Sequence, residues 1–129
     1  MAEQVFSKGA PDLSWLRDRR VLVVEDEYML AEDLRRDLEN QGAEVLGPVP
    51  TVAEALELLG QGPTPDLAVL DINLQGEKVY PVADALRAQA IPFLFTTGYD
   101  AQAIPSAYAD VPRTEKPLAL RDLLQAKPE

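Results

Sequence analysis

Apolar residues in this chain form short continuous runs that alternate with longer stretches of helical periodicity. The runs predict strands at residues 21–24, 67–70 and 93–96, and residues 44–46 predict a further short strand. Runs of this length, rich in β-branched and other apolar residues, are typical of strands buried on both faces of a sheet. Residues 113–115 predict a weaker fifth strand.

The stretches between these runs have the periodicity of amphipathic helices. In the first, leucines recur at every fourth position with charged residues between them. Helices are predicted at residues 28–41, 52–59, 81–89 and 118–126. No full helix is expected between the fourth and fifth strands, because Pro105 and Pro112 leave room for only a short turn or two.

Alternating strands and helices at this spacing predict a parallel sheet with helices on both faces. Because strand crossovers are right-handed, few topologies remain. We predict an α/β fold of the flavodoxin-like, doubly wound type. Its five strands would follow the order 2-1-3-4-5, and its fourth helix would be shortened or labile. Residues 20–129 would form this domain, and residues 1–19 an N-terminal extension whose Leu13, Trp15 and Leu16 can pack on it.

Composition narrows the chemistry that the domain can perform. The 129 residues suffice for one domain, and they include neither cysteine nor histidine. This excludes disulfides, thiolate zinc sites and histidine acid–base catalysis. The formal net charge of −10 disfavours binding to nucleic acid or to anionic membranes. Because the N-terminus is polar and no apolar run is long enough to span a bilayer, we expect a cytoplasmic protein.

Polar side chains follow four of the five predicted strands. Glu25 and Asp26 come after the first strand, Asp71 after the third, Thr97 at the end of the fourth and Lys116 after the fifth. Ligands of doubly wound sheets bind at the carboxyl ends of the strands, near the switch between strands 1 and 3. Carboxylates there can hold a hard cation, while a hydroxyl and an ammonium can bind phosphoryl oxygens.

Each of these residues also has a plain structural explanation. Acidic residues after a strand favour the N-terminus of the next helix, and aspartate is common in turns. Threonine is favoured in strands, and a single lysine is usually solvated. The placement of all of them at one sheet edge is what favours a functional site.

The segments that carry these residues resemble the receiver domain of two-component response regulators. The resemblance covers roughly residues 20–126 and rests on residues 21–27, 65–74, 97–98 and 116–117. A narrower resemblance is to the FATGUY class of receivers, which are commonly stand-alone. It rests on residues 71–77, 81–86 and 92–99. Thr96 and Asp100 stand where that class has alanine and tyrosine.

The resemblance implies a role for each acidic residue. Asp71 would accept the phosphoryl group. Glu25 and Asp26 would hold Mg²⁺ together with Asp71, and the backbone carbonyl of Asn73 would complete the metal shell.

The resemblance also implies how the domain responds. The hydroxyl of Thr97 and the ammonium of Lys116 would bind the phosphoryl oxygens, and the peptide before Pro117 would be cis. Many receivers carry an aromatic switch residue three positions before the lysine, where this chain has Arg113. We therefore expect the segment between Thr97 and Lys116 to become ordered on phosphorylation, in place of an aromatic rotation.

The function implied is that of a phosphorylation-controlled signalling protein, not of an enzyme. Its partners would be a sensor histidine kinase or histidine phosphotransfer protein and a downstream protein target, with a homodimer possible. A receiver-like binding module that works without phosphorylation is the alternative. A haloacid-dehalogenase-type phosphatase is disfavoured because residues 71–73 lack the second aspartate of its Asp-x-Asp motif. Residues 60–62 are too short a glycine motif to cradle a nucleotide phosphate.

Overall fold

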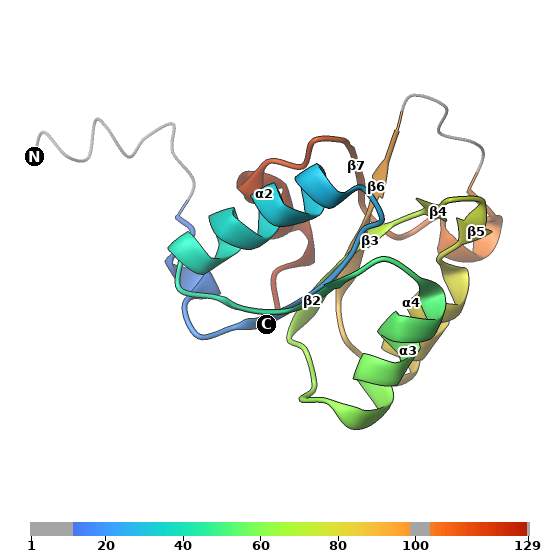
Figure 1. Ribbon diagram of the computed structural model, residues 1–129, viewed down its shortest axis with the longest axis horizontal. Coiled ribbons are helices and arrows are strands. Elements are labelled where there is room, and N and C mark those ends of the chain that lie inside the picture. Colours follow the sequence, from blue (N-terminus) through green and yellow to red (C-terminus); the bar gives the residue numbers. More distant parts are fainter. Residues whose placement is uncertain (1–11, 99–103, 129) are drawn as a thin grey trace, which may run out of the picture.

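The computed structural model describes residues 12–98 and 104–128 (Figure 1). Its main sheet has five parallel strands in the order β2-β1-β3-β6-β7. They are β1 (Arg20–Val24), β2 (Glu44–Val49), β3 (Leu67–Asp71), β6 (Phe93–Thr97) and β7 (Arg113–Glu115). Counted along the chain, this is the order 2-1-3-4-5, so the predicted flavodoxin-like fold is confirmed.

The helices cover both faces of the sheet. The α-helices are α2 (Tyr28–Asn40), α3 (Val52–Gln61) and α4 (Tyr80–Ala88). Three further helical segments are 3₁₀: η1 (Ser14–Leu16), η2 (Ser106–Tyr108) and η3 (Leu120–Ala126). Helices α3 and α4 lie side by side on one face, and α2 lies on the other (Figure 1).

Alternation of side chains along the strands divides the core into two layers. In β1, Leu22 and Val24 pack under α3 and α4, whereas Val21 and Val23 pack with Leu38 of α2. These four residues of β1 are fully buried. A strand covered on both faces has no polar alternation, which explains why its sequence is one apolar run.

Two elements differ from the expectation. A two-stranded hairpin, β4 (Asn73–Leu74) with β5 (Glu77–Lys78), was not predicted because each of its strands has only two residues. Its turn has positive φ at both Gln75 and Gly76, the conformation of tight hairpin loops. The last helix begins at Leu120, two residues later than expected, and is 3₁₀.

The region expected to hold a short fourth helix contains, among its described residues 104–112, only the turn η2. This part is anchored on α4. Tyr108 stacks on Tyr80 with ring centroids 4.6 Å apart. Its hydroxyl donates to Asp84 at 2.7 Å. Arg87 donates to the carbonyl of Ala107 at 3.1 Å and to Asp110 at 2.6 Å. Residues 99–103 lie outside the described part.

The described part of the N-terminal segment packs on the domain, as expected. Leu16 is fully buried in the layer beneath α2, with Leu13 and Trp15 beside it. The backbone amide of Asp18 donates to the carbonyl of Gly42 at 2.8 Å, which ties the segment to the end of α2. Across the described residues, we find no helix with the length and apolarity that a membrane crossing requires.

Candidate functional site

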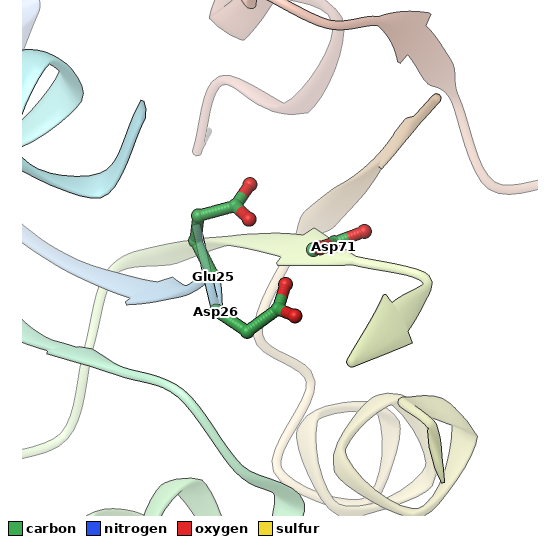
Figure 2. A group of neighbouring side chains, drawn as sticks. All are labelled: Glu25, Asp26 and Asp71. Atoms are coloured by element: carbon green, nitrogen blue, oxygen red, sulfur yellow. The ribbon is translucent and has the colours of Figure 1, made fainter. Parts of the chain in front are cut away.

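Three carboxylates meet at the carboxyl ends of β1 and β3 (Figure 2). Glu25 and Asp26 directly follow β1, and Asp71 is the last residue of β3. The two strands are paired in parallel up to Val24 and Leu70, so they end side by side. One carboxylate oxygen from each residue lies within 4.8 Å of those of the others. Asp71 is only 2% exposed.

Lys116, which directly follows β7, contacts this acidic cluster. Its Nζ donates to Asp71 at 2.9 Å, to Glu25 at 3.2 Å and to Glu27 at 2.7 Å. Its backbone amide donates to the carbonyl of Thr97 at 2.9 Å, which continues the pairing of β6 with β7. The predicted hydroxyl and ammonium residues are therefore held together by the sheet itself. The peptide bond between Lys116 and Pro117 is cis, as the resemblance implied.

Thr97 and Asn73 complete the set of predicted residues at this edge. Thr97 ends β6 and is buried. The amide of Asn73 donates to Asp71 at 3.2 Å, so the start of the hairpin fixes one oxygen of that carboxylate. The side chain of Asn73 accepts the amide of Gly76 at 2.8 Å and thereby closes the hairpin turn.

Glu27 follows the acidic pair directly, but no role was predicted for it from the sequence. In the structure, Glu27 makes the shortest of the three ion pairs to Lys116. Its own amide donates to Glu25 at 2.9 Å. The spacing of Glu25 and Glu27, two residues apart after a strand, is a signal that could have indicated this shared contact.

Burial and crowding make the cluster electrostatically unfavourable without a cation. Burial raises the pKa of Asp71 to about 8, and the nearby Asp26 and Glu25 add to this rise despite the opposing effect of Lys116. Burial also raises the pKa of Glu25. Burial alone would lower the pKa of Lys116, but its bonds to Glu27 and Asp71 outweigh this and raise it. The cluster therefore takes up protons more readily than isolated carboxyls do.

The donor set fits a hard divalent cation. All the candidate ligands are oxygens, and they come from two adjacent strand ends that are fixed by the sheet. Mg²⁺ prefers a few carboxylates at an accessible site where it keeps some of its waters. A bound cation would favour the charged form of Asp71 against the burial and the nearby carboxylates that raise its pKa.

Comparison with known proteins identifies the family. The model of the response regulator receiver domain matches residues 21–126. The chain belongs to this family. The match includes all five strands of the sheet, except for Arg20 at the start of β1, and every residue of the site described above. Receiver domains are signalling domains of two-component systems, and this chain shares that role.

Individual relatives support the assignment. The chain is 34% identical over 94 residues to the sensory transduction protein LytT of Bacillus cereus, covering 70% of this chain and 38% of that protein. It is 32% identical over 81 residues to the phyllosphere-induced regulator PhyR of Methylorubrum extorquens, covering 61% and 30%. The chain thus spans well under half the length of these curated relatives.

Solved structures agree with the fold. The solution structure of SdrG from Sphingomonas melonis has a TM-score of 0.73 and 40% identity, covering 84% of this chain and 92% of that one. The response regulator PhyR from Brucella abortus has a TM-score of 0.76 and 25% identity, covering 97% and 54%. Membership in the FATGUY class remains a prediction.

Proposed function

We propose that this chain is a phosphorylation-controlled response regulator whose Asp71 accepts a phosphoryl group. The donor would be a sensor histidine kinase or a histidine phosphotransfer protein. The observation that supports this most directly is the setting of Asp71. One of its oxygens bonds the ammonium of Lys116, and its carboxylate lies against Glu25 and Asp26. Two acidic neighbours beside a buried aspartate do not stabilise the fold, because the carboxylates repel one another, so their presence favours a functional role.

In the proposed reaction, an oxygen of Asp71 attacks the phosphorus of a phosphohistidine. The bond between phosphorus and the histidine nitrogen breaks, its electron pair returns to the imidazole, and an acyl phosphate forms on Asp71. Glu25, Asp26 and the carbonyl of Asn73 would hold Mg²⁺. When bound, this ion supplies the positive charge that offsets repulsion between the carboxylates and the incoming phosphoryl group.

Lys116 and Thr97 would then bind the new group. The ammonium already lies 2.9 Å from one oxygen of Asp71, within reach of a phosphoryl group attached there. Thr97 is joined to Lys116 through the backbone, so a contact to one positions the other. Together these two residues bound the segment that we expect to respond, residues 98–112.

The output would be a protein contact that depends on this segment. Arg113 occupies the position of the aromatic switch found in many receivers and is exposed, so it cannot take the role of that aromatic residue. Tyr108 instead packs edge-on against Phe95, with ring centroids 6.2 Å apart, and stacks on Tyr80 of α4. A rearrangement near Thr97 would therefore reach the surface of α4 and be available to a downstream protein or to a second copy of the chain.

Incubation with phosphoramidate and Mg²⁺, followed by a phosphate-affinity gel, tests the proposal. We expect one retarded band that disappears with hydroxylamine, as an acyl phosphate should. The band should be absent in Asp71→Asn and unchanged in Asp18→Asn, a matched substitution at an exposed residue of the N-terminal segment. A retarded band that survives in Asp71→Asn would refute the assignment. Partner binding with no retarded band in the wild type would favour the phosphorylation-independent binding module.

A further inference from the structure

A cavity of about 350 Å³ lies between α2 and the sheet, beside the acidic cluster. Its lining combines one face of α2, the end of β1, the middle of β3, Thr96 of β6 and the segment that follows β7. The lining residues used here are Leu30, Asp33, Leu34, Asp37, Thr96 and Leu118. The cavity also borders Glu25 and Lys116, so an occupant would touch two residues of the site described above.

A buried hydroxyl lies in the lining of this cavity. Thr96 is only 4% exposed, and its Oγ has no hydrogen-bond partner among the described residues. Thr96 and Leu94 are two positions apart on β6, so their side chains share one face of the sheet. Leu94 packs in the layer beneath α2, which places the Thr96 side chain on the cavity side. A buried hydroxyl without a partner is unfavourable, so it favours an occupant with a polar atom at this depth.

The rim of the cavity is acidic. Asp33 and Asp37 lie one turn apart on α2, on the same face as Leu30 and Leu34, and both are exposed. Arg36 approaches Asp33 at 3.7 Å, but both side chains are about 60% exposed, so this pair neutralises the rim only weakly. The charge on Lys116 is already matched by its three carboxylate partners. The rim therefore favours a positively charged occupant.

We propose that this cavity binds a small aliphatic amine that carries a second polar group at the far end of its chain. The ammonium would lie at Asp33 and Asp37, and the chain would pack against Leu30, Leu34 and Leu118. The second polar group would reach the hydroxyl of Thr96. The volume is in the range of small-molecule pockets, so a whole molecule of this size can be enclosed without a protein partner. Binding at this cavity does not require the phosphorylation proposed above, although an occupant would border Glu25 and Lys116.

Three probes of equal chain length separate the parts of the proposal. They are 5-aminopentan-1-ol, which has both polar ends, n-pentylamine, which lacks the hydroxyl, and pentanoate, which reverses the charge. Each is titrated into the ¹⁵N-labelled protein at constant ionic strength and followed by amide chemical shifts. We expect saturable shifts confined to residues 30–37, 94–96 and 116–118. The amino alcohol should bind roughly threefold to tenfold more tightly than pentylamine, and pentanoate should not saturate.

Variants test which residues give the preference. Thr96→Val keeps the shape of the side chain and should abolish the difference between the amino alcohol and pentylamine. Asp33→Asn combined with Asp37→Asn should weaken both amines by roughly threefold to tenfold. Glu57→Gln, at an exposed carboxylate on α3, is the matched control and should change neither. The proposal is overturned if pentanoate binds as well as the amines, if the shifts map to another face, or if no probe saturates at millimolar concentration. It is also overturned if Thr96→Val leaves the preference for the amino alcohol intact.

Discussion

Replacing Asp26 by asparagine should stabilise the metal-free protein and remove its stabilisation by Mg²⁺. Asp26 lies partly exposed at the end of β1, and its carboxylate oxygen is within 4.8 Å of those of Glu25 and Asp71. Asparagine keeps the shape of the side chain and removes one of the three charges. The repulsion that it relieves can be bounded from this geometry.

Two unit charges 4.8 Å apart repel by about 3 kcal/mol at an effective dielectric constant of 20, and by about 1 kcal/mol in water. The lower figure applies at pH 7, because the pKa of about 8 for Asp71 means that proton uptake already relieves part of the repulsion. For a domain of this size, ~1 kcal/mol corresponds to roughly 3–4 °C in Tm. We therefore expect Asp26→Asn to melt a few degrees above the wild type in EDTA.

In Mg²⁺, the wild type should melt at a higher temperature than Asp26→Asn. A ligand at ten times its Kd stabilises a folded protein by about 1.4 kcal/mol, or roughly 5 °C here. The wild type should gain this increment on addition of MgCl₂, and Asp26→Asn should gain little of it. Thermal melts at pH 7.5 in EDTA and in MgCl₂, at matched ionic strength, measure both effects.

Glu57→Gln removes one exposed carboxylate from α3 and serves as the control for net charge. Its Tm should follow that of the wild type in both buffers. An Asp26→Asn protein that is destabilised in EDTA would show that the carboxylates do not repel one another as the geometry implies. Undiminished stabilisation by Mg²⁺ in this variant would show that the cation binds elsewhere.

Four further predictions follow from the same structure. Lys116→Ala should still accept phosphate from phosphoramidate, but more slowly, and beryllofluoride should no longer shift its amide resonances; a response like that of the wild type would show that Lys116 does not take part in the response. Leu16→Ala should lower the free energy of unfolding by about 2–5 kcal/mol in urea titrations, because Leu16 is fully buried in the layer beneath α2; a loss below ~1 kcal/mol would show that the N-terminal segment is dispensable. Because the pKa of Asp71 is raised from 3.8 to about 8, the metal-free protein should lose stability as pH rises between these values, and urea midpoints of Asp71→Asn in EDTA should lack this loss; parallel profiles would contradict it. Hydrogen exchange of residues 104–112 should slow when beryllofluoride and Mg²⁺ are added, and Tyr108→Phe, which removes the bond to Asp84, should speed it in the free protein; unchanged exchange on activation would exclude an order change there.

The strands and the edge that carries the site could be predicted from sequence, because periodicity marks the strands and their right-handed crossovers leave few strand orders. A strand covered on both faces must be apolar throughout, and a polar residue just after it must then lie at the end of the strand. This reasoning placed Glu25, Asp26 and Asp71 correctly at one sheet edge. It could not find the hairpin at residues 73–78, whose strands are shorter than any periodic signal. Nor did it assign a role to Glu27, which follows the same strand end as Glu25 and contacts Lys116 beside it.

The anchoring of residues 104–112 was also beyond the reach of the sequence, which indicated only that prolines interrupt a helix there. The contacts that hold this part come from Arg87, Asp84 and Tyr80 of α4. The periodicity of α4 does not indicate that these side chains would contact a loop. Propensity describes what a segment forms alone. It does not describe the surface that the segment packs against, and here that surface determines the conformation.

The position of this segment bears on how a signal could leave the site. Residues 98–112 link Thr97 to the start of β7, and the pairing of β6 with β7 holds both ends of this stretch. The amide of Phe95 donates to the carbonyl of Pro112, and the amide of Lys116 donates to that of Thr97, each at 2.9 Å. A displacement of Thr97 or Lys116 relative to Asp71 therefore has to be taken up by the residues between them, since the strands themselves are fully paired. Among them, residues 104–112 contact α4 through bonds from Arg87 to Asp110 and Ala107, the bond of Tyr108 to Asp84 and the stacking of Tyr108 on Tyr80. Water can replace the polar contacts at small cost, because they are exposed. The paired strands on one side and the replaceable polar contacts on the other make the face formed by α4 and residues 104–112 the part of the surface that we expect to change, with Tyr108 and the buried Val111 linking it to the core.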